Sequence, residues 1–123
     1  MTVNVSVPVL VVHDYPTIGS IVTNVLRQIG FEHIDGAGNG RNALRKLRDK
    51  AYGLVISDDS IAPMSGEELL RAIRSQPEIA ETPFLLLTSP SKLAGTAAGR
   101  ADVLAKPFNA RTLQSRIAAV MQG

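Results

Sequence analysis

Short apolar runs of strand length alternate along this chain with longer stretches whose apolar residues recur at helical spacing. Continuous apolar runs at 8–12, 54–56, 84–87 and 103–105 are typical of strands that are covered on both faces, as in a parallel sheet. Residues 31–35 predict a shorter and weaker strand. Five strands that alternate with helices predict a doubly wound α/β fold, in which a parallel sheet carries helices on both faces.

Three helices are marked by their ends as well as by their spacing. Pro16 suits the first turn of a helix and Gly30 its end, and between them apolar residues recur at helical intervals: Ile18, Ile21, Val22, Val25, Leu26 and Ile29. Ser65 and Glu68 form a capping-box pattern that starts another helix. Asn109 can cap a last helix with four inward residues: Leu113, Ile117, Val120 and Met121.

Two further segments are less regular. Residues 36–40 are rich in glycine and predict a plain turn, since their spacing matches neither a P-loop nor a dinucleotide-binding loop. In the helix after them we expect a solvated basic face, with a patch for an acidic partner as the alternative: Arg41, Arg45, Lys46, Arg48 and Lys50. Between Pro90 and Gly99 a helix of only about two turns fits.

The composition excludes several classes of protein. None of the 123 residues is a cysteine, which rules out disulfides, thiolate zinc sites and cysteine nucleophiles. No apolar run is long enough to span a membrane and no signal-peptide pattern opens the chain, so we expect a cytoplasmic protein without membrane contact. The formal net charge of +2 gives no reason to expect direct nucleic-acid binding. The length predicts a single domain over 1–123, with its core at about 7–121.

Reactive polar residues follow four of the predicted strands. Asp14 comes after the first strand, Asp58 ends the third, Thr88 follows the fourth and Lys106 follows the fifth. Because the carboxyl ends of strands in an open parallel sheet line one crevice, we expect these four side chains to meet there. A single aspartate at a strand end is more often a turn former, so the prediction rests on the ordered set of four.

This set suits metal-assisted phosphoryl transfer to Asp58. A carboxylate repels an incoming phosphoryl group, and a divalent cation can neutralise both. Magnesium prefers oxygen ligands, which Asp14, Asp58 and a backbone carbonyl of the following loop can supply. Lys106 would add a mobile positive charge and Thr88 a hydroxyl donor for the phosphoryl oxygens.

The residues next to the two aspartates carry predictions of their own. Asp59 should point away from Asp58 along the chain, and we expect it in an exposed loop. His13 has three interpretations: a polar residue at the edge of the site, which we favour, a weak metal ligand, or a pH-sensitive neighbour of the site.

Five short segments carry a family resemblance: 9–14, 55–58, 64–66, 87–88 and 106–108. Together with the spacing of eight residues from Asp58 to Gly66, they resemble the receiver domain of two-component response regulators, in particular the single-domain chemotaxis type (CheY-like). The resemblance covers almost the whole chain, at about 7–121. It implies a flavodoxin-like sheet with strand order 2-1-3-4-5.

The resemblance implies that Asp58 accepts a phosphoryl group from a phosphohistidine on a sensor histidine kinase or a phosphotransfer protein. The implied cofactor is magnesium, bound by Asp14, Asp58 and the backbone carbonyl of Ser60. Thr88 and Lys106 would sense the phosphoryl group. Beyond autocatalytic phosphorylation and dephosphorylation of Asp58, no enzymatic activity is implied.

Three more residues are associated with the switch by the same resemblance: Ser89, Val103 and Pro107. Pro107 would follow a cis peptide bond, as a Lys-Pro pair in a tight turn can. Phosphorylation would reshape the face formed by the fourth helix, the fifth strand and the last helix, and so change binding to a downstream target protein. The implied oligomeric state is a monomer or a weak dimer.

The sequence departs from the family pattern at four places. His13 stands where the family usually has an acid, and Val103 where it often has an aromatic switch residue. The stretch between the fourth and fifth strands is shorter than in the chemotaxis type. Ala62 and Pro63 replace the usual position of the proline after the acceptor, which predicts a slightly different loop path.

These departures leave a second class of function open. The leading hypothesis is a phosphorylation-driven switch, and the alternative is a pseudo-receiver that binds proteins without phosphorylation. A phosphate sink that drains a shared kinase is a further alternative. A haloacid-dehalogenase-type phosphatase needs a second acid two residues after the nucleophile, where this chain has Ser60 and Pro16. A flavin carrier is disfavoured by acidic strand ends and by only 4% aromatic residues.

Overall fold

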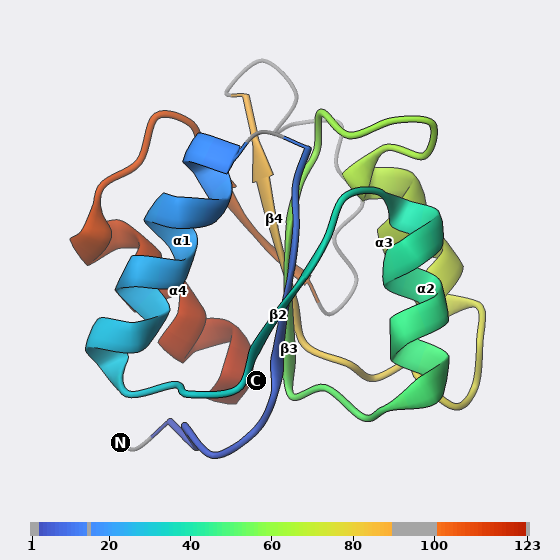
Figure 1. Cartoon of the computed structure of the whole chain (residues 1–123), viewed down its shortest axis with the longest axis horizontal. Coiled ribbons are helices and arrows are strands. Elements are labelled where there is room, and N and C mark those ends of the chain that lie inside the picture. The colour runs from blue at the N-terminus through green and yellow to red at the C-terminus, as the bar shows by residue number, and fades with distance from the viewer. Residues whose placement is uncertain (1–2, 15, 90–100, 123) are drawn as a thin grey trace.

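The computed structural model describes residues 3–14, 16–89 and 101–122, which form alternating strands and helices (Figure 1). In chain order these are β1 (Val9–Val12), α1 (Pro16–Ile29), β2 (Ile34–Ala37), α2 (Gly40–Asp49), β3 (Leu54–Asp58), α3 (Gly66–Arg74), β4 (Phe84–Thr88), β5 (Ala101–Ala105) and α4 (Ala110–Gln122). Among these helices, none is both long enough and apolar enough to cross a membrane.

All five strands pair in parallel in one sheet with the order β2-β1-β3-β4-β5. Helices α1 and α4 cover one face of this sheet, and α2 and α3 cover the other (Figure 1). The predicted fold class and the strand order implied by the resemblance are therefore confirmed.

Alternation along the strands divides the buried apolar residues into two clusters. The α1/α4 core joins strand residues to the first and last helix: Val9, Val11, Leu54, Ile56, Leu85 and Leu87 with Val22, Val25, Leu26, Leu113, Ile117 and Val120. The α2/α3 core lies on the other face: Leu10, Val12, Val55, Phe84 and Leu86 with Ala43, Leu44, Leu47, Leu69, Leu70 and Ile73. Strands that are buried on both faces explain why the apolar runs are continuous.

The predicted helix ends are confirmed by hydrogen bonds. The Ser65 hydroxyl accepts from the backbone N–H of Glu68 at 3.1 Å, and the Glu68 carboxylate accepts from the backbone N–H of Ser65 at 2.9 Å. Asn109 Oδ1 accepts from the backbone N–H of Thr112 at 2.9 Å. Gly30 follows α1 with a φ of 126°, a conformation that favours glycine.

The bounds predicted for one strand are wrong, and one predicted helix lies outside the described residues. The second strand occupies 34–37 instead of 31–35, because the buried Phe31 packs into the α1/α4 core from the loop while Gly36 and Ala37 pair with β1. Ile21 of α1 is 44% exposed, since the buried stripe of this helix is narrower than its apolar pattern. The short helix predicted at 90–99 lies outside the described residues.

A hydrogen-bonded cluster holds the edge strand β2 to the start of β3. The Tyr52 hydroxyl donates to Asp35 Oδ2 at 2.6 Å, and Lys50 Nζ lies 2.9 Å from the same oxygen. The hydrogen bond from Tyr52, followed by that from Lys50, lowers the pKa of the Asp35 carboxyl. Burial and the bond to Asp35 raise the pKa of Tyr52, so the phenol remains protonated.

Gly66 begins α3 at a point where the helix approaches the end of β3 very closely. A Cβ atom at this position would lie 2.6 Å from the Asp58 carbonyl oxygen and 2.9 Å from the Asp59 Cα. Both atoms belong to the backbone, which cannot rotate out of the way as a side chain can. Glycine is therefore required for α3 to start directly beside the acceptor strand.

We expect Gly66→Ala to lower the free energy of unfolding by about 1–3 kcal/mol, since the added methyl group meets backbone atoms. Gly38→Ala is the matched control, because a Cβ there has no neighbour within 4 Å. Urea denaturation of both variants measures the difference. Equal stability of the two variants would contradict the close approach.

We expect Tyr52→Phe to raise the pKa of Asp35 towards its usual value, because the larger of its two stabilising hydrogen bonds is lost. A carboxyl with a lowered pKa adds stability above its unfolded-state pKa, and this stability disappears as the pH falls through the lowered value. The stability gap between wild type and variant should therefore shrink on acidification below about pH 4.

An NMR titration of the Asp35 carboxyl together with urea denaturation at several pH values tests this prediction. Lys50→Gln is the control and should shift the pKa of Asp35 less than Tyr52→Phe does. A larger shift in Lys50→Gln would show that the ion pair is the main cause.

Candidate functional site

The residues singled out at the strand ends emerge together at the carboxyl edge of the sheet. Val12 of β1 pairs with Ser57 of β3, Asp58 with Leu87 of β4, and Thr88 with Ala105 of β5. The chain therefore leaves all four strands at nearly the same level. This edge is the crevice in which open parallel sheets bind ligands.

Asp58 lies at the end of β3 with only 2% of its surface exposed. Its Oδ1 is 2.6 Å from Lys106 Nζ, which reaches over from the residue after β5. The backbone N–H of Ser60 approaches the same oxygen at 3.5 Å. A buried carboxylate is costly unless it is paired, and Lys106 supplies the opposite charge.

Asp59 is buried, with only 6% of its surface exposed, so the prediction of an exposed loop residue is wrong. Its Oδ2 accepts from the hydroxyl of Thr88, itself 1% exposed, at 3.3 Å. Its Oδ1 accepts from the backbone N–H of Glu67 at 3.3 Å. The prediction failed because the first turn of α3 packs against the residue after β3. The positive end of this helix also favours a carboxylate there.

The two adjacent carboxylates lie on opposite faces of the sheet. Asp58 continues the alternation of Leu54 and Ile56 and therefore lies on the α1/α4 side. Thr88 continues the alternation of Phe84 and Leu86 on the α2/α3 side, and its contact with Asp59 places Asp59 there as well. The site thus contains an Asp58–Lys106 pair and an Asp59–Thr88 pair.

Asp14 and Ser60 are exposed residues that follow β1 and β3. Across the described ranges, no three acidic, histidine or cysteine side chains gather in a way that could hold a metal ion by themselves. The oxygen donors expected from the sequence are the carboxylates of Asp14 and Asp58 and the carbonyl of Ser60, which lie at or after the ends of the paired strands β1 and β3. Such a set suits magnesium, which binds one or two carboxylates and keeps several of its waters.

His13 leans towards α1. Its imidazole occupies the space that a side chain at Gly19 would take, since a Cβ built there would overlap Nε2, Cε1 and Cδ2 of the ring. Within the described part of the chain, His13 Nδ1 is buried without a hydrogen-bond partner. The ring also borders a hollow that is lined by residues of α1, among them Ser20 and Thr23.

The three residues associated with the switch lie on β4 and β5 or beside them. Val103 is half-buried and packs against the α2/α3 core. The peptide bond between Lys106 and Pro107 is cis, as the resemblance implies, and the backbone N–H of Lys106 donates to the Thr88 carbonyl at 2.8 Å. Ser89 is half-buried after β4. A second cis bond, between Ala62 and Pro63, lies in the loop after the acceptor strand.

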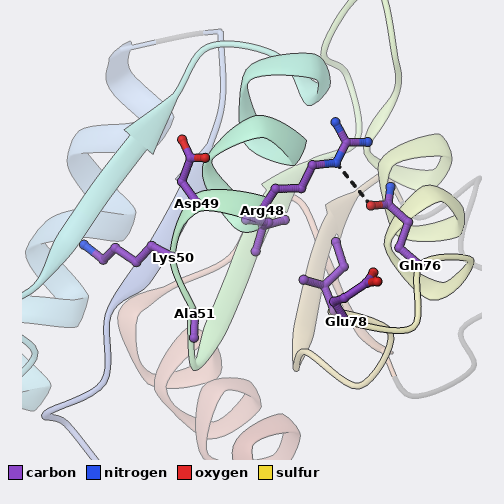
Figure 2. Close-up of a pocket in the computed structure, with 8 residues that line it drawn as sticks. Arg48, Asp49, Lys50, Ala51, Gln76 and Glu78 are labelled. Carbon is purple, nitrogen blue, oxygen red and sulfur yellow. Dashed lines mark hydrogen bonds between the residues drawn. The ribbon is translucent and has the colours of Figure 1, made fainter.

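A larger hollow lies at the opposite edge of the sheet, between the carboxyl ends of α2 and α3 (Figure 2). Its lining carries charges of both signs, with Arg48 and Lys50 beside Asp49 and Glu78. Arg48 Nε donates to Gln76 Oε1 at 3.3 Å across it. Because the strands begin at this edge, the hollow is separate from the strand-end site, and its balanced charges favour no particular ligand.

Comparison with known proteins agrees with this geometry. Residues 9–118 match the family described as the response regulator receiver domain. The chemotaxis protein CheY-3 of Vibrio cholerae is 32% identical over 118 residues, which make up 93% of this chain and 91% of that protein. The structure of the chemotaxis response regulator CheY4 of Vibrio cholerae has a TM-score of 0.81 at 33% identity, over 94% of this chain and 98% of that one.

A second structure is similar in fold alone. The receiver domain of the sensor histidine kinase PA1611 from Pseudomonas aeruginosa, described with a magnesium ion coordinated in its active site cleft, has a TM-score of 0.83 at 22% identity, over 96% of this chain and 99% of that one. The family match, the strand order and the chemotaxis relatives lead to one conclusion: the chain belongs to the response regulator receiver domain family and functions in two-component signal transduction.

Proposed function

We propose that Asp58 is the residue that accepts the phosphoryl group. The observation that carries this proposal is the buried Asp58 carboxylate, held 2.6 Å from Lys106 Nζ at the carboxyl edge of the sheet. A lysine at this distance offsets the negative charge of the nucleophile before transfer and can follow the phosphoryl oxygens afterwards. The donor would be a phosphohistidine on a sensor histidine kinase or on a phosphotransfer protein.

The transfer would exchange one bond to phosphorus for another. An oxygen of Asp58 forms a new bond to phosphorus while the bond between phosphorus and the donor imidazole nitrogen breaks, and the released imidazole takes a proton from solvent. Lys106 occupies Oδ1, which leaves Oδ2 as the attacking oxygen. Attack of water on phosphorus would break its bond to the Asp58 oxygen, release inorganic phosphate and return the carboxylate. Apart from this autocatalytic cycle we propose no enzymatic activity.

Asp14, Asp58 and the carbonyl oxygen of Ser60 would hold magnesium, which neutralises charge on the carboxylates and the phosphoryl group when it is bound. His13 adds no negative charge to this donor set. Its ring is directed towards Gly19 of α1, which supports a place at the edge of the site over a role as ligand. The magnesium described in the PA1611 receiver domain is consistent with this assignment.

Thr88 and Lys106 would bind the phosphoryl oxygens, with Ser89, Val103 and Pro107 passing the change towards a downstream target. Val103 has no ring that could rotate into a space left by Thr88, so we infer that the change is carried by packing against the α2/α3 core. We propose one receiver domain over 1–123 that acts in the cytoplasm as a monomer or weak dimer. Its output is a change in protein binding, without direct contact to nucleic acid.

We expect Asp58→Asn to abolish the phosphoryl adduct that forms when the protein is incubated with acetyl phosphate and magnesium, since the amide is not a nucleophile. Intact-mass spectrometry detects the adduct. Asp59→Asn is the matched control and should still be labelled at position 58. An Asp58→Asn protein labelled to the same level as wild type would remove Asp58 from its role.

We expect His13→Asp to tighten magnesium binding by about three- to tenfold, because it adds a carboxylate next to Asp14. Calorimetric titration of magnesium measures the affinity. His13→Asn, which removes the imidazole without adding charge, is the control and should leave the affinity close to that of wild type. Equal affinities in wild type and His13→Asp would show that position 13 does not face the cation.

A further inference from the structure

The proposed function gives no part to Asp59, although its side chain is buried beside the site. Its carboxylate accepts from the Thr88 hydroxyl and from the Glu67 backbone N–H, both at 3.3 Å. Its backbone is held as well, because its N–H donates to Leu87 at 2.8 Å and its carbonyl accepts from Gly66 at 3.1 Å. Asp59 therefore joins the end of β3 to the end of β4 and to the first turn of α3.

The Thr88 hydroxyl has one hydrogen to donate. In the structure this hydrogen is directed at the Asp59 carboxylate, whereas a phosphoryl group on Asp58 would offer a second set of anionic oxygens. Hydrogen bonds to anionic acceptors are stronger than those to neutral ones, so both acceptors are effective. A single hydroxyl cannot serve both at once.

The geometry separates the two acceptors. Asp58 lies on the α1/α4 side of the sheet, and Asp59 with Thr88 on the α2/α3 side. Threonine is branched at Cβ and occupies a few staggered side-chain rotamers, so its hydroxyl changes acceptor by a discrete step. A contact of this kind has two states whose balance depends on the strength of each acceptor.

We propose that Asp59 is a positioning residue that holds the Thr88 hydroxyl in the unphosphorylated protein and competes for it with the phosphoryl group on Asp58. Asp59 thereby opposes activation and sets the balance between the two forms. This inference rests on the proposed function of Asp58 and adds a regulator to that site.

Asp59→Asn tests the competition with little change in shape. Of the described residues, Thr88 and Glu67 direct donors at the two carboxylate oxygens of Asp59, and an asparagine can accept from only one of these two with its single oxygen. If the amide oxygen keeps the fixed N–H of Glu67, the amide NH₂ faces Thr88 and donates to its oxygen. The hydroxyl hydrogen is then free for a phosphoryl group.

The probe is beryllofluoride, a phosphoryl mimic, titrated with magnesium present and followed by ¹⁹F NMR. We expect Asp59→Asn to bind beryllofluoride about tenfold more tightly than wild type, the size expected for one hydrogen bond to a charged group. Asp49→Asn, which removes an exposed carboxylate at the end of α2, is the matched control and should bind like wild type.

A double-mutant cycle separates this mechanism from a simple charge effect. In a Thr88→Val background Asp59→Asn should change the affinity little, because no hydroxyl remains to compete for. In a Thr88→Ser background, which restores the hydroxyl, the tightening should return. Equal tightening in the wild-type and Thr88→Val backgrounds would show that the charge of Asp59 acts directly, and the inference would be wrong.

The unliganded protein provides a second readout. A buried, hydrogen-bonded hydroxyl exchanges slowly with water, so the Thr88 hydroxyl proton should be visible by NMR in wild type and should shift in Asp59→Asn. If the chemical shift of this proton is the same in wild type and Asp59→Asn, Thr88 does not donate to Asp59 and the inference is wrong. Failure of wild type to bind beryllofluoride at millimolar magnesium overturns the proposed function as well, whereas normal binding without tightening in Asp59→Asn overturns the inference alone.

Discussion

Two adjacent carboxylates are buried at the end of β3, and much of the site follows from the need to pair them. Desolvation makes each of them costly unless donors or an opposite charge lie within reach. Lys106 meets this need for Asp58, and the Thr88 hydroxyl with the first turn of α3 meets it for Asp59. These donors come from the two strands that follow β3 in the sheet and from the helix that leaves it, so the strand order itself determines which residues can serve.

The same constraint explains the tight backbone around the acceptor. For α3 to present its positive end to Asp59, its first residue has to lie against the backbone of β3, which only glycine permits. The capping box at Ser65 fixes where the helix starts, and so which N–H group reaches the carboxylate. The spacing from Asp58 to Gly66 is thus explained by the loop that must bring the first residue of α3 against the backbone at the end of β3.

The sequence correctly predicted the features that depend on neighbouring residues in the chain: the buried strands, the polar strand ends and the helix caps. Continuous apolar runs reveal buried parallel strands, and a polar residue at the end of such a run must lie at the carboxyl edge, which was enough to bring Asp58 and Lys106 together. Caps such as Ser65 and Asn109 are recognisable because their hydrogen bonds span only a few residues. The strand order came from the family resemblance and is confirmed by the sheet.

The sequence did not predict features that depend on contacts between elements far apart in the chain. Alternation correctly directs Asp59 away from Asp58, but it does not reveal that the first turn of α3 covers the other side. Phe31 has the apolar character of a strand residue and enters the core from a loop, while Gly36 in the adjoining strand has no side chain to signal pairing. The helical spacing of apolar residues in α1 does not report how wide the covered stripe is, and Ile21 is exposed.

His13 and Gly19 occupy one shared volume between β1 and α1, although five residues separate them in the chain. An imidazole at the first position leaves no room for a side chain at the second. The two positions are therefore coupled through space. A side chain at position 19 would push the imidazole out of its present place, and a smaller residue at position 13 would leave room for one.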